Sequence, residues 1–396
     1  IEISNKQINK KKLFSSMKRG GKEFRASSYD ELILRNIKKP KKLESIKKKV
    51  QMIFSILACG LGYSVVSEFC EYNDFPIISE SMFYDYLHFF DQKLDVLSGQ
   101  ICSEKLKEAL SNEQFIVGFD AGWAHKRNAN QCIGVLMDLL TGLIISFQII
   151  YHGPENSGNI TSTQVHSKSF EKIALEKILN KIQISDEIKM IFVHDCDISA
   201  DSIVSKKYPF CDIKYDPNHY VKTQKSIIDS YCSEDKLLKK FNEKIKNFYS
   251  DLMHDTEKNI ETKMEKWKNM VNYFITNQNW SEKENSDTIQ NLKNLIDELS
   301  ESFSKIDPLY TTNGCESFNH SRAMLANKDI AWRLTWRIRA FISIIRWNCD
   351  NWVEVILNEF QIFNINDSIA KRKKMVRKNK RIIEKTTKYK KKEQFI

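Results

Sequence analysis

The chain has 396 residues and a mass of 46.5 kDa; 41% of its residues are hydrophobic and 29% are charged. This length allows two or three domains with a sizeable core, and the composition excludes a disordered or fibrous chain. No apolar run reaches the roughly 20 residues that a membrane crossing needs, so we expect neither a transmembrane segment nor a membrane partner. The low content of Gly (12) and Pro (6) favours a helix-rich protein.

The positive charge is concentrated at both ends of the chain. Residues 1–50 hold 16 Lys and Arg against 5 Asp and Glu, and residues 371–396 hold 13 against 2, so each end carries +11. Because the whole chain also carries +11, the residues between them carry −11. Basic ends suit a polyanion such as DNA, through phosphate contacts and counterion release. A solubilising or nuclear-targeting tail explains them equally well.

The first 110 residues predict helices after a polar start. Residues 1–47 are expected to form a basic, poorly ordered lead. From residue 48 the helical pattern continues to a break at Phe75-Pro76, and Ser79 offers an N-cap for a second helix over Ser79–Phe90. Two helices joined in this way resemble a helix-turn-helix, so residues 48–110 predict a helical DNA-binding-like domain. Core packing of its aromatic residues explains the same pattern.

Residues 111–222 predict the first part of an α/β core. Three consecutive strands, plausibly antiparallel, are expected over Phe115–Asp120, Asn130–Leu139 and Gly142–Tyr151, with a tight turn at Leu140-Thr141-Gly142. A helix (Ser169–Lys181), a strand (Lys189–His194), a helix (Ser199–Lys206) and a strand (Cys211–Asp216) follow. This order is the one expected of an RNase H-like mixed sheet flanked by helices.

The remaining third of the chain predicts helices. Residues 223–308 are expected to form a large all-helical insertion, because Gly and Pro are scarce and charged residues recur at helical spacing. Residues 309–366 would complete the core with C-terminal helices, and residues 367–396 form a basic tail. Tryptophans at helical spacing in this part favour helix packing over base stacking: Trp332, Trp336, Trp347 and Trp352.

Three acidic residues are distinguished by their placement. Asp120 ends the apolar segment FIVGFD, Asp195 ends MIFVHD, and Glu316 lies in TTNGCESFN where a new helix would begin. Such acids suit Mg²⁺, which prefers oxygen ligands, and two ions about 4 Å apart can clamp the oxygens of a phosphodiester displacement. Asp197, two residues after Asp195, is its rival as the second carboxylate.

The segments FDAGW, VHDCD followed by DPNH, and TTNGCESFN resemble signatures of eukaryotic DDE transposases of the Mutator-like and Kolobok-like groups. The resemblance implies catalytic, metal-binding carboxylates at Asp120, Asp195 and Glu316. It also points to accessory residues, which are Asp197, Asp216, His219, Asn313 and Asn319. His219 would carry a proton or brace the fold. Basic residues near these motifs are candidate DNA contacts: Lys126, Arg127, Arg322 and Lys328.

The resemblance implies a DNA transposase that cleaves phosphodiesters at element ends and transfers the freed strand into target DNA. It implies Mg²⁺ or Mn²⁺ as cofactor, with two ions, and DNA as partner, namely the terminal repeats and the target. It also implies a homo-oligomer in the nucleus. Two alternatives stay open: a domesticated or inactive relative that only binds DNA, and another RNase H-like nuclease.

Overall fold

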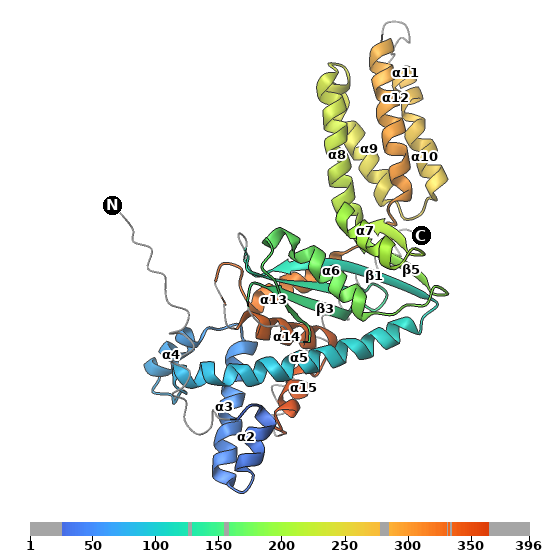
Figure 1. Cartoon of the computed structure of the whole chain (residues 1–396). Coiled ribbons are helices and arrows are strands. Elements are labelled where there is room, and N and C mark those ends of the chain that lie inside the picture. Colours follow the sequence, from blue (N-terminus) through green and yellow to red (C-terminus); the bar gives the residue numbers. More distant parts are fainter. Residues whose placement is uncertain are drawn as a thin grey trace. The chain divides into compact units, whose positions relative to one another are not determined.

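The computed structural model describes residues 26–125, 129–153, 158–277, 285–330, 332 and 335–363. The chain forms two compact units, one made of the residues up to Ser98 together with those from Arg322 onward, and one made of Gly99–Ser321 (Figure 1). The first boundary falls inside helix α5 (Glu80–Leu110) and the second inside α13 (Asn313–Leu325). Sequence analysis placed residues 309–366 in the α/β core, whereas this division assigns the residues from Arg322 onward to the other unit.

The unit Gly99–Ser321 contains a mixed six-stranded sheet. Its strands are β1 (Gln114–Trp123), β2 (Gln131–Asp138), β3 (Leu143–Tyr151), β4 (Ile160–Ser162), β5 (Lys189–His194) and β6 (Asp212–Tyr215). They lie in the order β4-β3-β2-β1-β5-β6, with β1, β2 and β3 antiparallel and β1, β5 and β6 parallel. The predicted α/β class and the five predicted strands are therefore confirmed, and β4 is an additional edge strand.

The turn between β2 and β3 is the one that the sequence predicts. Gly142 adopts φ +71°, a left-handed conformation that glycine tolerates without strain. Asp138, at the end of β2, accepts hydrogen bonds from the amides of Leu140 and Thr141 at 3.3 and 3.1 Å. Every residue of β2 is buried, so this strand belongs to the core, whereas the turn residues Leu140 and Thr141 are exposed.

Helices cover the sheet of this unit. On one side, α6 (Phe170–Lys181) packs Leu175, Ile178 and Leu179 against the strand residues Phe115 and Phe119. Helix α7 (Ile198–Lys207) joins the same hydrophobic core, and a short 3₁₀ helix η3 (Ser167–Ser169) precedes α6. The predicted helices over Ser169–Lys181 and Ser199–Lys206 are thus confirmed within one residue at each end.

The described residues of the predicted all-helical insertion, 223–308, contain helices and no strand, and the first helix begins earlier, at Pro217. The insertion comprises α8 (Pro217–Glu234), η4 (Leu238–Phe241), α9 (Asn242–His254), α10 (Ile260–Lys268), α11 (Met270–Asn277), α12 (Ser286–Ser300) and η5 (Glu301–Ser304). Trp267 is fully buried and packs against Tyr249 and Phe303 in a hydrophobic core that the insertion forms itself. The insertion returns beside its starting point, because the Tyr215 amide donates to the Lys305 carbonyl at 2.8 Å.

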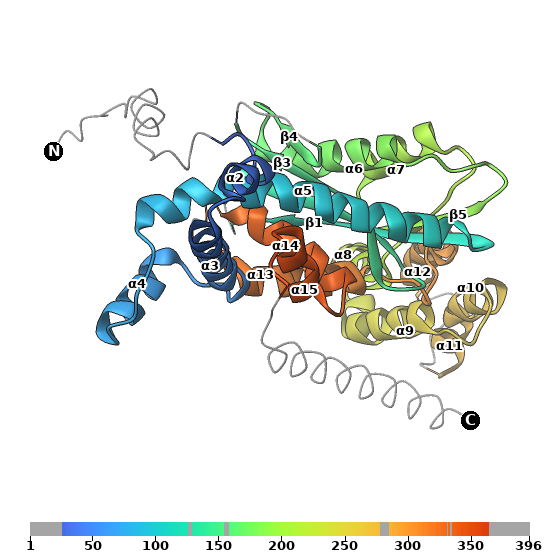
Figure 2. The same cartoon turned by 90° about the horizontal axis from the view of Figure 1, so that it is seen from below.

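The other unit is helical. It contains α2 (Tyr29–Asn36), α3 (Pro40–Ala58), α4 (Tyr63–Tyr72), the start of α5, α14 (Trp336–Asn348) and α15 (Trp352–Glu359), as Figure 2 shows from below. The break expected at Phe75-Pro76 is confirmed, since α4 ends at Tyr72 and α5 begins at Glu80. The expectation of a poorly ordered lead is wrong for residues 26–47, which include α2 and the start of α3.

The core of this helical unit is held by buried polar groups as well as by apolar packing. The Arg339 guanidinium donates to the carbonyls of Leu57, Leu61 and Leu325 at 3.2, 2.6 and 2.8 Å. Trp336 and Trp352 are buried and pack helices as the sequence favoured, whereas Trp332 and Trp347 are partly exposed. Among the described residues no single helix is long and apolar enough to cross a membrane, although α3 and α4, bent by 112°, satisfy that test as a pair.

Candidate active site

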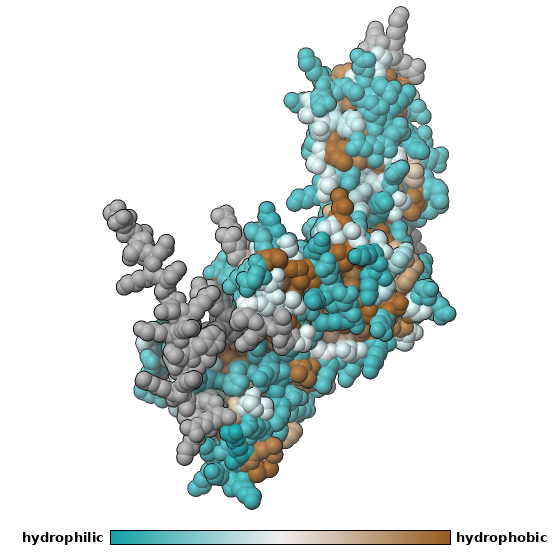
Figure 3. All heavy atoms as spheres, viewed as in Figure 1, coloured by the Kyte–Doolittle hydropathy of each residue, from teal (hydrophilic) through white to brown (hydrophobic). Residues whose placement is uncertain are grey.

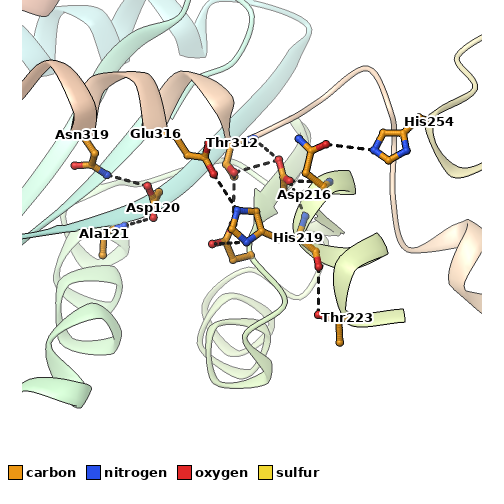
Figure 4. A network of polar contacts seen from close by, with 11 residues as sticks. Asp120, Ala121, Asp216, His219, Thr223, His254, Thr312, Glu316 and Asn319 are labelled. Carbon is orange, nitrogen blue, oxygen red and sulfur yellow. Dashed lines mark hydrogen bonds and ion pairs between the residues drawn. The ribbon is translucent and has the colours of Figure 1, made fainter. Parts of the chain in front are cut away.

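Asp120 lies in the second half of β1, where the strand becomes less buried. Its Oδ1 accepts a hydrogen bond from the Ala121 amide at 2.7 Å, and its Oδ2 accepts one from Asn319 Nδ2 at 2.8 Å (Figure 4). Burial raises the pKa of Asp120; the two hydrogen bonds oppose this rise and the charge of Glu316 adds to it. Since Asn319 and Glu316 lie one turn apart on α13, the first acid is joined to the helix that carries the third.

Small residues at the start of α13 let that helix approach the sheet closely. A Cβ atom on Gly314 would meet Met137 Sδ at 2.6 Å, and Cys315 Sγ donates to the Gly118 carbonyl at 3.5 Å. Cys315 is fully buried, whereas the next side chain, Glu316, is 50% exposed. The sequence NGCE therefore anchors the first turn on β1 and β2 and turns the carboxylate of Glu316 outward beside them.

His219, in the first turn of α8, joins the second and third acids. Its Nδ1 lies 3.4 Å from Asp195 Oδ2 and its Nε2 lies 2.9 Å from Glu316 Oε1. Burial lowers the pKa of His219, but the hydrogen bond to Glu316 and the charges of Asp195 and Asp216 outweigh it and raise that pKa above its ordinary value. The pair of carboxylates thus favours the protonated imidazole between them.

Asp216 links the two helix starts that carry His219 and Glu316. It is fully buried at the N-cap of α8, where its Oδ1 accepts from the amides of Asn218 and His219 at 2.9 and 3.1 Å. Its Oδ2 accepts from the amide and the hydroxyl of Thr312, immediately before α13, at 2.8 and 3.1 Å. A buried carboxylate with four donors is fully hydrogen-bonded, so Asp216 acts on the position of its neighbours rather than on a substrate.

Asp195 follows the end of β5 and is partly exposed. Burial raises its pKa to about 6; the negative charges of Asp120, Asp216 and Glu316 add to this rise, and His219 opposes it. Carboxylates influence one another in this way only when they lie close together. The strand ends and the helix start therefore bring the three acids singled out from the sequence into one region.

Glu171, in the first turn of α6, is a fourth acid of the same region, and sequence analysis missed it. Burial raises its pKa to about 7, and the charges of Asp120, Asp197 and Asp195 add to the rise. In the sequence it is one of many acids near a helix N-terminus, where they commonly offset the helix dipole. Only the packing of α6 beside the strand ends brings Glu171 close to Asp120 and Asp195.

Asp197 has a different role from Asp195. It is exposed and caps α7, accepting from the amide and the hydroxyl of Ser199 at 2.8 and 2.7 Å. Asp195 instead contacts His219 and accepts from the Thr312 hydroxyl at 3.4 Å. Of the two rivals, Asp195 is the one whose carboxylate joins the contact network of Glu316.

The structure describes two of the four candidate DNA contacts, Arg322 and Lys328. Arg322 is fully buried, with its guanidinium 5.2 Å from the centroid of the Trp336 ring, so the expectation that it contacts DNA is wrong. Lys328 is partly exposed in the turn after α13, and Asn313 is exposed at the first position of that helix. Lys126 and Arg127 lie outside the described residues.

The donor set fits a hard divalent cation. Carboxylates from three elements repel one another, and the buried Oδ1 of Asn319 has no hydrogen-bond partner among the described residues. A cation would relieve that repulsion and give the Asn319 oxygen a partner, directly or through water. In the arrangement seen, no three His, Cys, Asp or Glu side chains of the described part of the chain surround one point as metal ligands, and His219 separates Asp195 from Glu316.

No protein-family model matches the chain, and no curated protein matches it significantly.

Proposed function

We propose that the chain is a DDE-type DNA transposase that cleaves DNA phosphodiesters with divalent metal ions and transfers the freed strand. The observation that carries the proposal is the single contact network containing Asp120, Asp195 and Glu316. In it, His219 touches two of the acids, and Asn319 joins the third to the helix of Glu316. The charges of neighbouring acids raise the pKa of Asp120 and of Asp195, and such repulsion costs stability, so the convergence of these acids supports a catalytic centre.

The architecture supports the finer assignment of an RNase H-like core. Three antiparallel strands are followed by β5 and β6, which lie parallel to β1 and are each preceded by a helix. Asp120 belongs to the central strand and Asp195 follows its parallel neighbour, so both lie toward the same end of the sheet. The long insertion then separates them in sequence from the helix of Glu316.

Each residue has a role in this proposal. Asp120, Asp195 and Glu316 would hold one or two Mg²⁺ or Mn²⁺ ions, which supply charge stabilisation for in-line displacement at phosphorus when bound. Asn319 orients Asp120 through its amide. His219, whose protonated form is favoured by the acids, would donate its proton to the leaving oxygen.

The partners follow from the resemblance to DDE transposases. They are the terminal repeats of an element and its target DNA, and we propose a homo-oligomer acting in the nucleus. The acids explain why metal ions are needed before such a site can receive a phosphodiester, since an uncompensated cluster of carboxylates repels phosphate.

The proposal is tested by incubating the full chain with supercoiled plasmid DNA and a labelled 3′-hydroxyl oligonucleotide in Mg²⁺ or Mn²⁺. We expect plasmid nicking and joining of the label, and loss of both in Asp120→Ala and Glu316→Ala while DNA binding is retained. Asp197→Ala, which removes an exposed helix cap, is the matched control and should keep activity.

Other outcomes identify the alternatives. DNA binding without nicking by the unaltered chain would favour a domesticated DNA-binding relative. Preferential cleavage of an RNA–DNA hybrid in the same assay would favour another RNase H-like nuclease. Activity that survives in either the Asp120 or the Glu316 variant would overturn the assignment of the site.

A further inference from the structure

The helical unit carries a concentrated positive surface on α3 and the turn before it. Residues 38–49 contain seven lysines and one acid, Glu44. Lys38, Lys39, Lys41 and Lys48 are exposed, and the other three lysines are partly exposed. Figure 3 shows that the visible surface over α2 and α3 is predominantly hydrophilic. This is the densest run of like charge among the described residues of the helical unit.

The opposite face of α3 fixes that surface in place. Ile46, Val50, Ile53 and Leu57 are fully buried, at the three- and four-residue spacing of one helix face. Because this face is in the core of the unit, the lysines on the other face stand on a rigid helix rather than on a mobile segment.

The lysines border a groove. It has a volume of about 380 Å³ and runs between the outer face of α3 and the segment Pro76–Ile78. Lys41 and Lys48 lie seven residues apart on the same face, which separates them by roughly 10 Å along the helix. Lys48 pairs with Glu44 at 2.8 Å, but both side chains are largely exposed, and such pairs contribute only about 0–1 kcal/mol.

The helix that the sequence favoured for DNA reading, Ser79–Phe90, has the opposite charge, and so has α4 before it. Residues 79–90, at the start of α5, contain Glu80 and Asp85 and no Lys or Arg. Helix α4 contains Glu68 and Glu71 and likewise no Lys or Arg. Acidic helices repel phosphates, so neither is suited to approach a duplex first.

We propose that the exposed face of α3 with Lys41 and Lys48, together with Lys38 in the turn before the helix, binds the phosphate backbone of duplex DNA. This inference rests on the proposed function, in which DNA is the substrate, and it names the surface of the helical unit that holds it. Lysines on a rigid helix contact phosphates without reading bases, so the contribution of α3 is independent of sequence and depends strongly on salt.

The test compares two triple variants of the full chain that lose the same charge. Lys38→Gln/Lys41→Gln/Lys48→Gln alters α3, and Lys236→Gln/Lys239→Gln/Lys240→Gln alters exposed lysines of the insertion. Binding of a fluorescein-labelled mixed-sequence duplex is followed by anisotropy without divalent metal, over about 0.05–0.2 M salt. We expect the α3 variant to bind about tenfold or more weakly at low salt, with a salt slope shallower by about three. The insertion variant should match the unaltered chain.

Equal losses in both triples, or no loss in the α3 triple, would overturn the proposal. So would an α3 triple that keeps its duplex binding and loses binding to vesicles of anionic phospholipid, because the surface would then be a membrane-binding one. Circular dichroism confirms that the variants fold. If Asp120→Ala and the unaltered chain both fail to nick DNA while the α3 effect persists, the catalytic proposal fails and the DNA-binding surface stands.

Discussion

Asp216→Asn tests whether the buried carboxylate holds the two helix starts of the candidate site together. The substitution keeps the shape of the side chain but replaces one acceptor oxygen with an NH₂ donor. Asn is a good N-cap, so its remaining oxygen can keep the bonds from the amides of Asn218 and His219. The new NH₂ group then faces the amide and the hydroxyl of Thr312.

The magnitude follows from those contacts. The Thr312 hydroxyl can rotate to accept from the new amide, but the Thr312 N–H cannot, so a buried donor loses its charged acceptor. Such a loss costs about 2–4 kcal/mol of unfolding free energy. Because the start of α13 is released, Glu316 also loses its fixed position, and metal-dependent cleavage should fall together with stability.

Urea unfolding of the full chain, followed by tryptophan fluorescence and circular dichroism, measures the effect. Asp197→Asn is the matched control: it exchanges two good caps at an exposed position and should change stability by less than about 0.5 kcal/mol. Stability of Asp216→Asn equal to that of the control would refute the reasoning.

Three further predictions concern other features. Gly314→Ala would place a methyl group against Sδ of the flexible Met137 side chain, which can shift, so the variant should lose no more than about 1 kcal/mol of unfolding free energy. In thermal melts Gly314→Ala/Met137→Ala should lose less than the sum of the two single variants, and an additive loss would contradict this contact. Burial raises the pKa of Glu171 from 4.5 to about 7, so in the pH range between these two values the folded state holds a proton that the unfolded state releases. The metal-free protein should therefore lose stability as the pH rises through it, and urea midpoints of Glu171→Gln should show a flatter profile, whereas an unchanged profile would refute the shift. In Arg339→Lys the lysine cannot donate to all three carbonyls that the guanidinium reaches, so the variant should lose about 2–4 kcal/mol of unfolding free energy. A melting temperature equal to that of the unaltered protein would contradict this prediction.

Local patterns in the sequence were enough to predict most of the α/β unit. The strand at Lys189–His194 matches β5 because the apolar run MIFV is flanked by polar residues, and the hairpin follows from Gly142. Helix α13 follows from the break at TTNG, which also places Glu316 in a first turn. Strand β4 was missed because its three residues are defined by pairing with β3 and not by their own pattern.

Other features depend on tertiary context or were obscured by charge. The start of α3 was assigned to a poorly ordered lead because its lysines outnumber its apolar residues, although Ile46, Val50 and Ile53 already show helical spacing. Glu171 carries no local signal, since only packing brings α6 next to the other acids. Arg322 looked like a DNA contact in the sequence because burial of an arginine depends on partners far along the chain.

The base of the helical insertion has a consequence for how such a protein can change. Tyr215 and Ile306 form a parallel bridge, and Lys214 Nζ donates to the Ser304 carbonyl at 3.0 Å, so the excursion leaves and re-enters the sheet at adjacent positions. An extra segment whose ends already meet can grow, shrink or be exchanged without pulling on the strands beneath it. The part of the excursion beyond α8, residues 235–300, is therefore the natural place to change its size or to graft a foreign module, while Asp216, His219 and the acids beside them keep their positions.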